Sequence, residues 1–179
     1  HPDHAFFMRS REEILDTGAA VYAPETTPAA LAVRVAPALV DVRGLHVSPV
    51  PTFHSRLVKS TGYLVEDPSA GKRMLYTGDI IWIDPDYWPR LERLDLVITD
   101  GSFLRRGGLV RTDAATGVSF GHNGIPDLVE LFERFTDHIV FSHFGEWFYR
   151  DIRDSRRRIA RFSNASLVEA AWDGMLAAG

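Results

Sequence analysis

Histidine and aspartate residues recur in this chain where short apolar, strand-like segments end. His54 closes one such segment, Asp79 follows a second after a glycine, and His143 follows a third. Each residue alone has an ordinary explanation, as a satisfied core histidine or as an aspartate in a turn or helix N-cap. Ligand-binding side chains gather where the strands of one sheet end at a common edge. In a mixed α/β sandwich, the three residues are therefore expected to converge at one edge.

The chain opens on His1-Pro2-Asp3-His4, which places two imidazoles and a carboxylate in one tight turn. Imidazole nitrogens and carboxylate oxygens suit zinc, manganese or iron. The alternative is a solvated terminus with two incidental histidines, and the later strand-end residues favour metal binding. Because a ligand-type residue stands first in place of methionine, we interpret the chain as the C-terminal portion of a longer protein. An uncovered core face, filled by a missing N-terminal segment or a homodimer partner, is then expected.

Composition narrows the class of protein. With 179 residues, the chain is expected to form one domain over residues 1–179, and its 45% hydrophobic and 25% charged residues are typical of soluble globular proteins. A net charge of −4 provides no general attraction to nucleic acid or to a membrane. The chain has no cysteine, so disulfides and thiolate ligands are excluded, and a cytoplasmic location is expected. It also has no apolar run long enough for a membrane span.

Hydrophobic periodicity and turn residues predict strands alternating with helices. The strands are expected at residues 20–23, 39–50 with a break at Gly44, 50–54, 63–66, 73–77, 94–99 and 139–141. The helices are expected at residues 10–18, after Thr27-Pro28, and at residues 86–94, 125–135 and 148–162. Residues 105–121, rich in glycine, arginine and threonine, are predicted to form a loop. Residues 167–176 are predicted to form a terminal hairpin that turns at Asp173-Gly174.

These features resemble the metallo-β-lactamase superfamily of αββα hydrolases. The opening His-Pro-Asp-His is similar to the last four positions of its H-x-H-x-D-H motif, and His54, Asp79 and His143 match its later ligands in order. Several further stretches resemble the phosphodiesterase branch, which contains ribonuclease Z-like and cyclic phosphate phosphodiesterase-like enzymes. They are residues 60–63, 76–79, 97–103, 121–123 and 171–175. The resemblance implies a metallo-β-lactamase αββα sandwich whose N-terminal strands are missing from the chain.

The resemblance also implies two divalent metal ions, zinc first, with manganese or iron as alternatives. The implied ligands are His1, Asp3, His4, His54, Asp79 and His143. Of these, His1 and His54 would hold one ion, and Asp3, His4 and His143 would hold the other. Asp79 would bridge the two ions, since a carboxylate has two oxygens. Asp3 would in addition orient the nucleophilic hydroxide and so act as a catalytic residue.

His122 is the second implied catalytic residue. It lies in Gly121-His122-Asn123-Gly124, just before the helix predicted from residue 125, whose free N–H groups favour an anion. In the resembling phosphodiesterases, a histidine at this position binds phosphate and assists the leaving group. The alternative is an exposed histidine in a flexible glycine loop. Asp100 stands where related nucleases often have glutamate, which suggests a supporting contact to His122.

The implied function is hydrolysis of a small, in some cases cyclic, phosphodiester through a metal-bound hydroxide. Only one predicted hairpin separates His54 from Asp79, which leaves no room for the long tRNA-binding arm of ribonuclease Z-type enzymes. A small-molecule substrate is therefore favoured over nucleic acid, and no membrane partner is expected. The arginines of residues 150–161 are interpreted as a solvated helix face paired with Asp151 and Asp154. Two alternatives remain: hydrolysis of another ester or amide, such as a lactone, thioester or β-lactam, and a non-catalytic metal-binding or interaction module.

Overall fold

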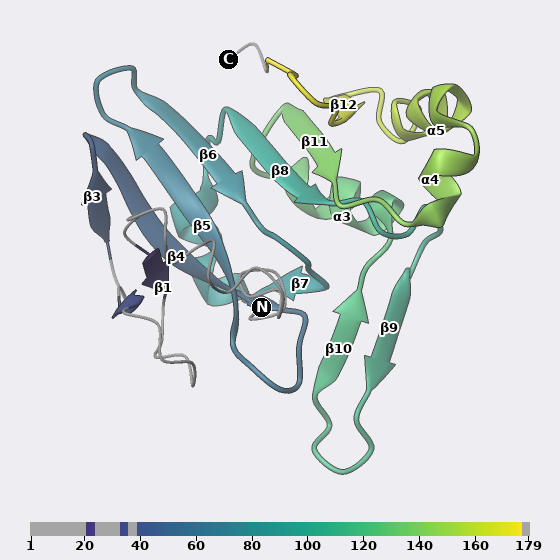
Figure 1. Ribbon diagram of the computed structural model, residues 1–179, viewed down its shortest axis with the longest axis horizontal. Coiled ribbons are helices and arrows are strands. Elements are labelled where there is room, and N and C mark those ends of the chain that lie inside the picture. The colour runs from purple at the N-terminus through teal and green to yellow at the C-terminus, as the bar shows by residue number, and fades with distance from the viewer. Residues whose placement is uncertain (1–20, 24–32, 36–38, 177–179) are drawn as a thin grey trace.

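The computed structural model describes residues 21–23, 33–35 and 39–176, and Figure 1 shows their arrangement. The predicted ligands His1, Asp3 and His4 lie outside the described residues, as do the helices predicted at 10–18 and after Thr27. Strands β1 (Val21–Ala23) and β2 (Val33–Val35) form a short parallel pair.

A single sheet with the strand order β12-β11-β8-β6-β5-β4-β3 organises the chain, and β7 pairs with β4. Its strands are β3 (Val40–Val42), β4 (Leu45–Phe53), β5 (Ser60–Asp67), β6 (Lys72–Tyr76), β7 (Trp82–Ile83), β8 (Leu96–Asp100), β11 (His138–Ser142) and β12 (Leu167–Ala170). From β3 to β6 the neighbours are antiparallel, and from β6 to β12 they are parallel. Two turns that the sequence predicts, at Gly44 and at residues 67–71, join the antiparallel strands.

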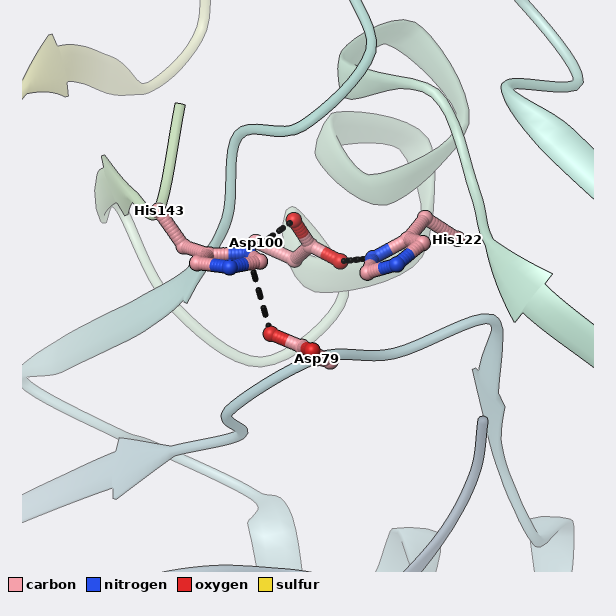
Figure 2. A group of neighbouring side chains, drawn as sticks. All are labelled: Asp79, Asp100, His122 and His143. Carbon is pink, nitrogen blue, oxygen red and sulfur yellow. Dashed lines mark hydrogen bonds and ion pairs between the residues drawn. The ribbon is translucent and has the colours of Figure 1, made fainter. Parts of the chain in front are cut away.

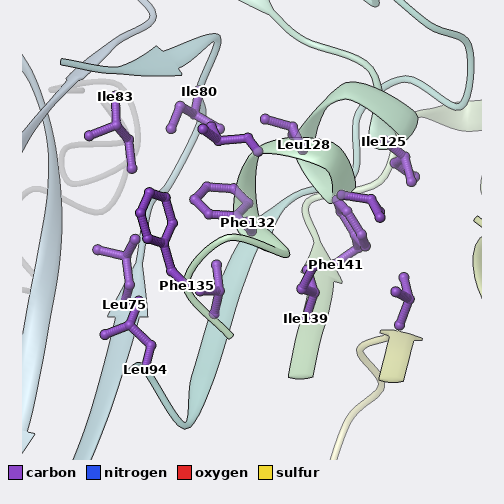
Figure 3. Close-up of a cluster of buried hydrophobic side chains, with 14 of the residues drawn as sticks. Leu75, Ile80, Ile83, Leu94, Ile125, Leu128, Phe132, Phe135, Ile139 and Phe141 are labelled. Carbon is purple, nitrogen blue, oxygen red and sulfur yellow. The ribbon is translucent and has the colours of Figure 1, made fainter. Parts of the chain in front are cut away.

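The parallel half of the sheet packs against helix α3 (Ile125–Phe132). The helix buries Ile125, Leu128, Val129, Leu131 and Phe132, because the 3.6-residue period places them on one face. These side chains meet apolar residues of the sheet in one core, part of which Figure 3 shows. Full burial of each large apolar side chain contributes about 1.5–3 kcal/mol. The core thus fixes the strands whose ends carry the candidate site.

The prediction of a loop at residues 105–121 is wrong. Residues 105–122 contain strands β9 (Leu109–Thr112) and β10 (Ser119–His122), which form an antiparallel hairpin. Figure 1 shows the hairpin projecting from the sheet, and every residue of β9 is exposed. A strand that does not pack on the core needs no alternation of apolar and polar residues, so the periodicity gave no signal.

The single helix predicted at residues 148–162 is also wrong, because two helices occupy the region. Helix α4 (Glu146–Arg150) ends where Asp151 adopts extended dihedral angles (φ −153°, ψ 94°). The Asp151 side chain then accepts a hydrogen bond from the Asp154 N–H and caps α5 (Ile152–Ile159). At the predicted helix 86–94, the structure has the 3₁₀ helix η1 (Pro85–Leu91), capped by Asp84.

The predicted C-terminal hairpin is wrong as well. Its first strand, β12, pairs in parallel with β11, and the turn at Asp173-Gly174 leads to no returning strand among the described residues. None of the helices in the described part of the chain combines the length and the apolar character that a membrane crossing requires.

Candidate functional site

Five side chains from different strand ends converge at one edge of the sheet. His54 follows β4, Asp79 follows β6, Asp100 ends β8, His122 ends β10 and His143 follows β11. Figure 2 shows four of them pointing toward one another. Because β6, β8 and β11 are parallel neighbours, their C-terminal ends meet at the same edge.

The donor atoms of this group are close enough to surround a cation. One ligand atom from each of Asp79, Asp100, His122 and His143 lies within 4.8 Å of the others. His143 Nδ1 is 3.0 Å from one oxygen of Asp79, and His54 Nε2 is 3.6 Å from the other oxygen. Imidazole nitrogens with carboxylate oxygens are the donors that zinc, manganese and iron accept. The residues therefore fit a divalent metal ion of this kind.

His54 is held in the orientation that a metal ligand needs. Its Nδ1 lies 2.8 Å from the Gly121 carbonyl oxygen, so Nδ1–H donates and Nε2 turns toward Asp79. Burial lowers the pKa of His54, although the Gly121 carbonyl and Asp79 oppose this effect. A neutral ring with its Nδ1–H on a carbonyl keeps the Nε2 lone pair available for a metal.

Asp100 is a buried carboxylate with partners on both oxygens. Oδ2 accepts from His122 Nδ1 at 2.6 Å and from the Ile80 N–H at 3.2 Å. Oδ1 accepts from the Ser102 N–H at 2.9 Å and from the Ser102 hydroxyl at 2.6 Å. Burial alone would raise the pKa of Asp100, but hydrogen bonds from His122 and His143 outweigh it and lower the pKa. Asp100 is thus charged, and its oxygens are occupied by neighbouring donors.

The charge of Asp100 acts on His122. Burial alone would lower the pKa of His122, but the hydrogen bond and the negative charge of Asp100 outweigh it and raise the pKa. The bond occupies Nδ1, which leaves Nε2 as the ring nitrogen that does not face Asp100. The His122 ring also stacks against His143, with 5.8 Å between ring centroids. His122 is therefore a fixed imidazole that favours its protonated form.

The site as a whole favours positive charge. Hydrogen bonds to Asp100 and Asp79 raise the pKa of His143 to about 10. His143 also has φ +54°, a left-handed conformation that costs a residue other than glycine about 1–2 kcal/mol. Such strain at a non-glycine residue is typical of functional sites. Two carboxylates that hold a proton this firmly would also hold a metal cation.

Ser102 belongs to the site, and the sequence analysis missed its role. Besides its bond to Asp100, its hydroxyl oxygen lies 3.1 Å from His143 Nδ1 and 3.3 Å from His122 Nδ1. The segment Asp100-Gly101-Ser102 lies in a stretch that resembles the phosphodiesterases, but its spacing alone gives no partner for the hydroxyl. The expected contact between Asp100 and His122 is present.

No protein-family model matches the chain, and no curated protein matches it. Among solved structures, the metallo-β-lactamase fold protein YhfI from Bacillus subtilis is similar with a TM-score of 0.56 at 17% identity, over 76% of this chain and 51% of that chain. A protein from Veillonella parvula described as a possible metal-dependent hydrolase has a TM-score of 0.56 at 15% identity, over 81% of this chain and 58% of its own. A diphosphatase of the PhnP family has a TM-score of 0.52 at 17% identity, over 79% and 46% of the two chains.

The chain spans about half the length of these solved structures, because the match covers 46–58% of each of them. At such low sequence identity, the similarity shows the fold but not the activity, which has to be inferred from the residues of the site. The mixed α/β arrangement of the described elements around one large sheet agrees with this fold. The predicted fold is confirmed: the chain has the metallo-β-lactamase fold.

Proposed function

We propose that this protein is a metal-dependent hydrolase that cleaves a small phosphodiester. The observation that carries the proposal is the hydrogen-bonded Asp100–His122 pair, which lies in one group of metal-type donors with Asp79 and His143. His54, Asp79 and His143 would hold divalent metal, with His1, Asp3 and His4 as the further ligands that the sequence resemblance implies. Two such ions, zinc first, would lower the pKa of water toward 7 and polarise a phosphoryl oxygen.

The chain's own residues supply positioning and a proton. His54 is aimed by the Gly121 carbonyl, and Asp79 lies between His54 and His143 with one oxygen toward each. Asp100 keeps a proton on His122 Nδ1 and favours the cationic ring. The second nitrogen of that ring, Nε2, can then donate a hydrogen bond to a phosphate oxygen or a proton to the leaving oxygen.

The cationic His122 favours a phosphodiester over the alternative substrates. A phosphodiester keeps a negative charge throughout its hydrolysis, so a fixed imidazolium stabilises both the bound ester and its transition state. A lactone, thioester or β-lactam is neutral before attack and gains less from such a group. The structural similarity to a PhnP-family diphosphatase also supports phosphoryl chemistry.

The test is a hydrolysis panel with metal-loaded full-length protein, containing bis-p-nitrophenyl phosphate, a cyclic nucleotide, a lactone and a β-lactam. Asp79→Ala should lose metal and nearly all activity, because no neighbouring histidine replaces the shared carboxylate. His122→Ala should keep its metal and lose roughly 10²–10⁴-fold in kcat, as expected for a positioned acid. The loss should be smaller for p-nitrophenolate, which needs little protonation.

His138→Ala is the matched control, because His138 pairs with Glu169 at 2.8 Å on β11 and β12 and contacts none of the five site residues. It should leave the metal content and kcat unchanged. Turnover of the lactone or β-lactam but of no phosphodiester would replace the proposal by the other hydrolase class. A metal-loaded protein inactive on the whole panel would favour a non-catalytic module. Loss of metal in His122→Ala would make His122 a ligand.

A further inference from the structure

The β9–β10 hairpin, here called the arm, has one end at the site and extends from there into solvent. His122 at the end of β10 belongs to the site, and the rest of the arm projects away from the sheet (Figure 1). The strands of the arm pair with each other and with no other described strand. An isolated two-stranded hairpin is marginally stable, so contacts with the body must hold it in place. One such contact joins the Gly121 N–H to the His54 carbonyl oxygen at 2.8 Å.

The residues that follow β4 lie along one face of the arm. The ring centroids of His54 and His122 are 4.7 Å apart, and the Arg56 guanidinium lies 5.2 Å from the Phe120 ring centroid. Residues 54 and 56 thus contact residues 122 and 120, which places Phe120 on the same face of the arm as His122. Arg111 is the cross-strand partner of Phe120, so it also stands on this face. We call the surface formed by Arg56, Arg111 and Phe120 the inner face.

The inner face carries net positive charge in the exposed part of the arm. Arg56 is paired with Asp113 at 2.6 Å. Arg111 is exposed, and no hydrogen bond or ion pair joins its side chain to another residue in the described part of the chain. Arg56, Arg111 and Asp113 together carry a net charge of +1, and this charge lies beside the aromatic ring of Phe120. A guanidinium presents a fork of donors that matches a phosphate.

The spacing relates this charge to the proposed site. Phe120 and His122 are two residues apart on a strand, which corresponds to about 7 Å. Arg111 lies level with Phe120 across the arm, and its side chain can reach further outward. An anion on the inner face would therefore lie about one nucleotide's length from a phosphodiester held at His122.

We propose that the inner face binds a second phosphate of the substrate, so that the preferred substrate is a nucleotide-like phosphodiester with a further terminal phosphate. This inference rests on the proposed function, because it names the substrate class of the same site. Arg111 would contact the second phosphate directly. Arg56 would keep the Phe120 ring and the arm in place and add a cation beside it.

The test compares thymidine dinucleotides without a terminal phosphate and with one at the 5′ or 3′ end, using metal-loaded full-length protein. Wild type should prefer one of the phosphorylated dinucleotides. Arg111→Ala should raise KM for that substrate on the order of ten-fold, the value of one charged hydrogen bond. Its kcat, its metal content and its KM for the unphosphorylated dinucleotide should stay unchanged.

Two variants provide controls. Arg111→Lys keeps the charge but loses the fork of donors, and should recover part of the KM. Arg153→Ala removes another exposed arginine, from α5, which lies far from the arm in Figure 1, and should change nothing. Equal effects of Arg111→Ala on phosphorylated and unphosphorylated substrates, or no effect on either, would overturn the proposal.

Failure of the proposed function can be told apart from failure of this inference. If wild type hydrolyses none of the dinucleotides, binding of dye-labelled phosphorylated dinucleotide to the metal-loaded protein is measured by fluorescence anisotropy. Weaker binding by Arg111→Ala than by wild type and Arg153→Ala would support the inner face as a phosphate site. Equal binding by all three proteins, or none, would overturn it.

Discussion

Replacing Asp100 by asparagine separates a positioning carboxylate from a metal ligand. The substitution preserves the shape of the side chain and removes its charge. The asparagine oxygen can still accept from the Ser102 N–H and hydroxyl, which lie 2.9 and 2.6 Å from Asp100 Oδ1. Its amide nitrogen then faces His122 Nδ1 and the Ile80 N–H, where Asp100 has an acceptor oxygen. His122 must therefore give up its Nδ1 proton to accept from the amide.

The size of the effect follows from the lost interaction. A hydrogen bond to a charged group is worth about 1.5–3 kcal/mol, which corresponds to roughly 10- to 150-fold in an equilibrium or a rate. We expect kcat of Asp100→Asn to fall by this factor for a substrate with a poor leaving group, and by less for p-nitrophenyl esters. The unsatisfied Ile80 N–H should also lower the free energy of unfolding by about 1–3 kcal/mol.

The pH dependence should change in one direction. Asp100 raises the pKa of His122, and activity that needs protonated His122 falls as the pH rises through this pKa. Without the charge of Asp100, the pKa drops and the alkaline limb of the kcat profile should move to lower pH. The assay is kcat against pH with metal stoichiometry measured in parallel, and Asp154→Asn on α5 serves as the control. Metal loss specific to Asp100→Asn, or an alkaline limb that does not move, would refute this reasoning.

Two other predictions concern the core and the arm. Phe132→Ala removes a fully buried ring from α3 and should lower the free energy of unfolding by about 3–5 kcal/mol in denaturant titrations. The control Tyr149→Ala, at a 64% exposed position, should change it by less than about 0.5 kcal/mol. Similar losses for both variants would contradict the assigned core. The hydrogen bond from Arg56, with backbone N–H groups of residues 115 and 116, lowers the pKa of Asp113 to about 2, so this ion pair should persist on acidification until the pH falls through that value. In Arg56→Ala the pKa of Asp113 should rise toward its ordinary value of 3.8, as carboxyl NMR titration would show, and an unchanged pKa would mean that the ion pair is not formed in solution.

Much of the fold could be predicted because the relevant signals are local. Glycine and proline mark the turns at Gly44 and at residues 67–71. The apolar strands and the helical period of α3 reflect burial in one core. The positions of His54, Asp79 and His143 after successive strands also indicated convergence, since strand ends share a sheet edge. The residues before 39 that carry His1, Asp3 and His4 lie largely outside the described structure, and their role as ligands remains a prediction.

Only the tertiary structure decided the features that do not depend on burial in the core. The arm is exposed along β9, so its strands carry no alternation, and only their pairing reveals them. The break between α4 and α5 depends on one capping side chain, Asp151, inside a run of helix-forming residues. Apart from the bonds that Asp100 and Ser102 make to each other, their side-chain hydrogen bonds reach residues 20 to 41 positions away in sequence, so no local pattern could specify them. The sequence determined which side chains reach the sheet edge, and the fold determined which atoms face one another there, because hydrogen bonds depend on distances that packing sets.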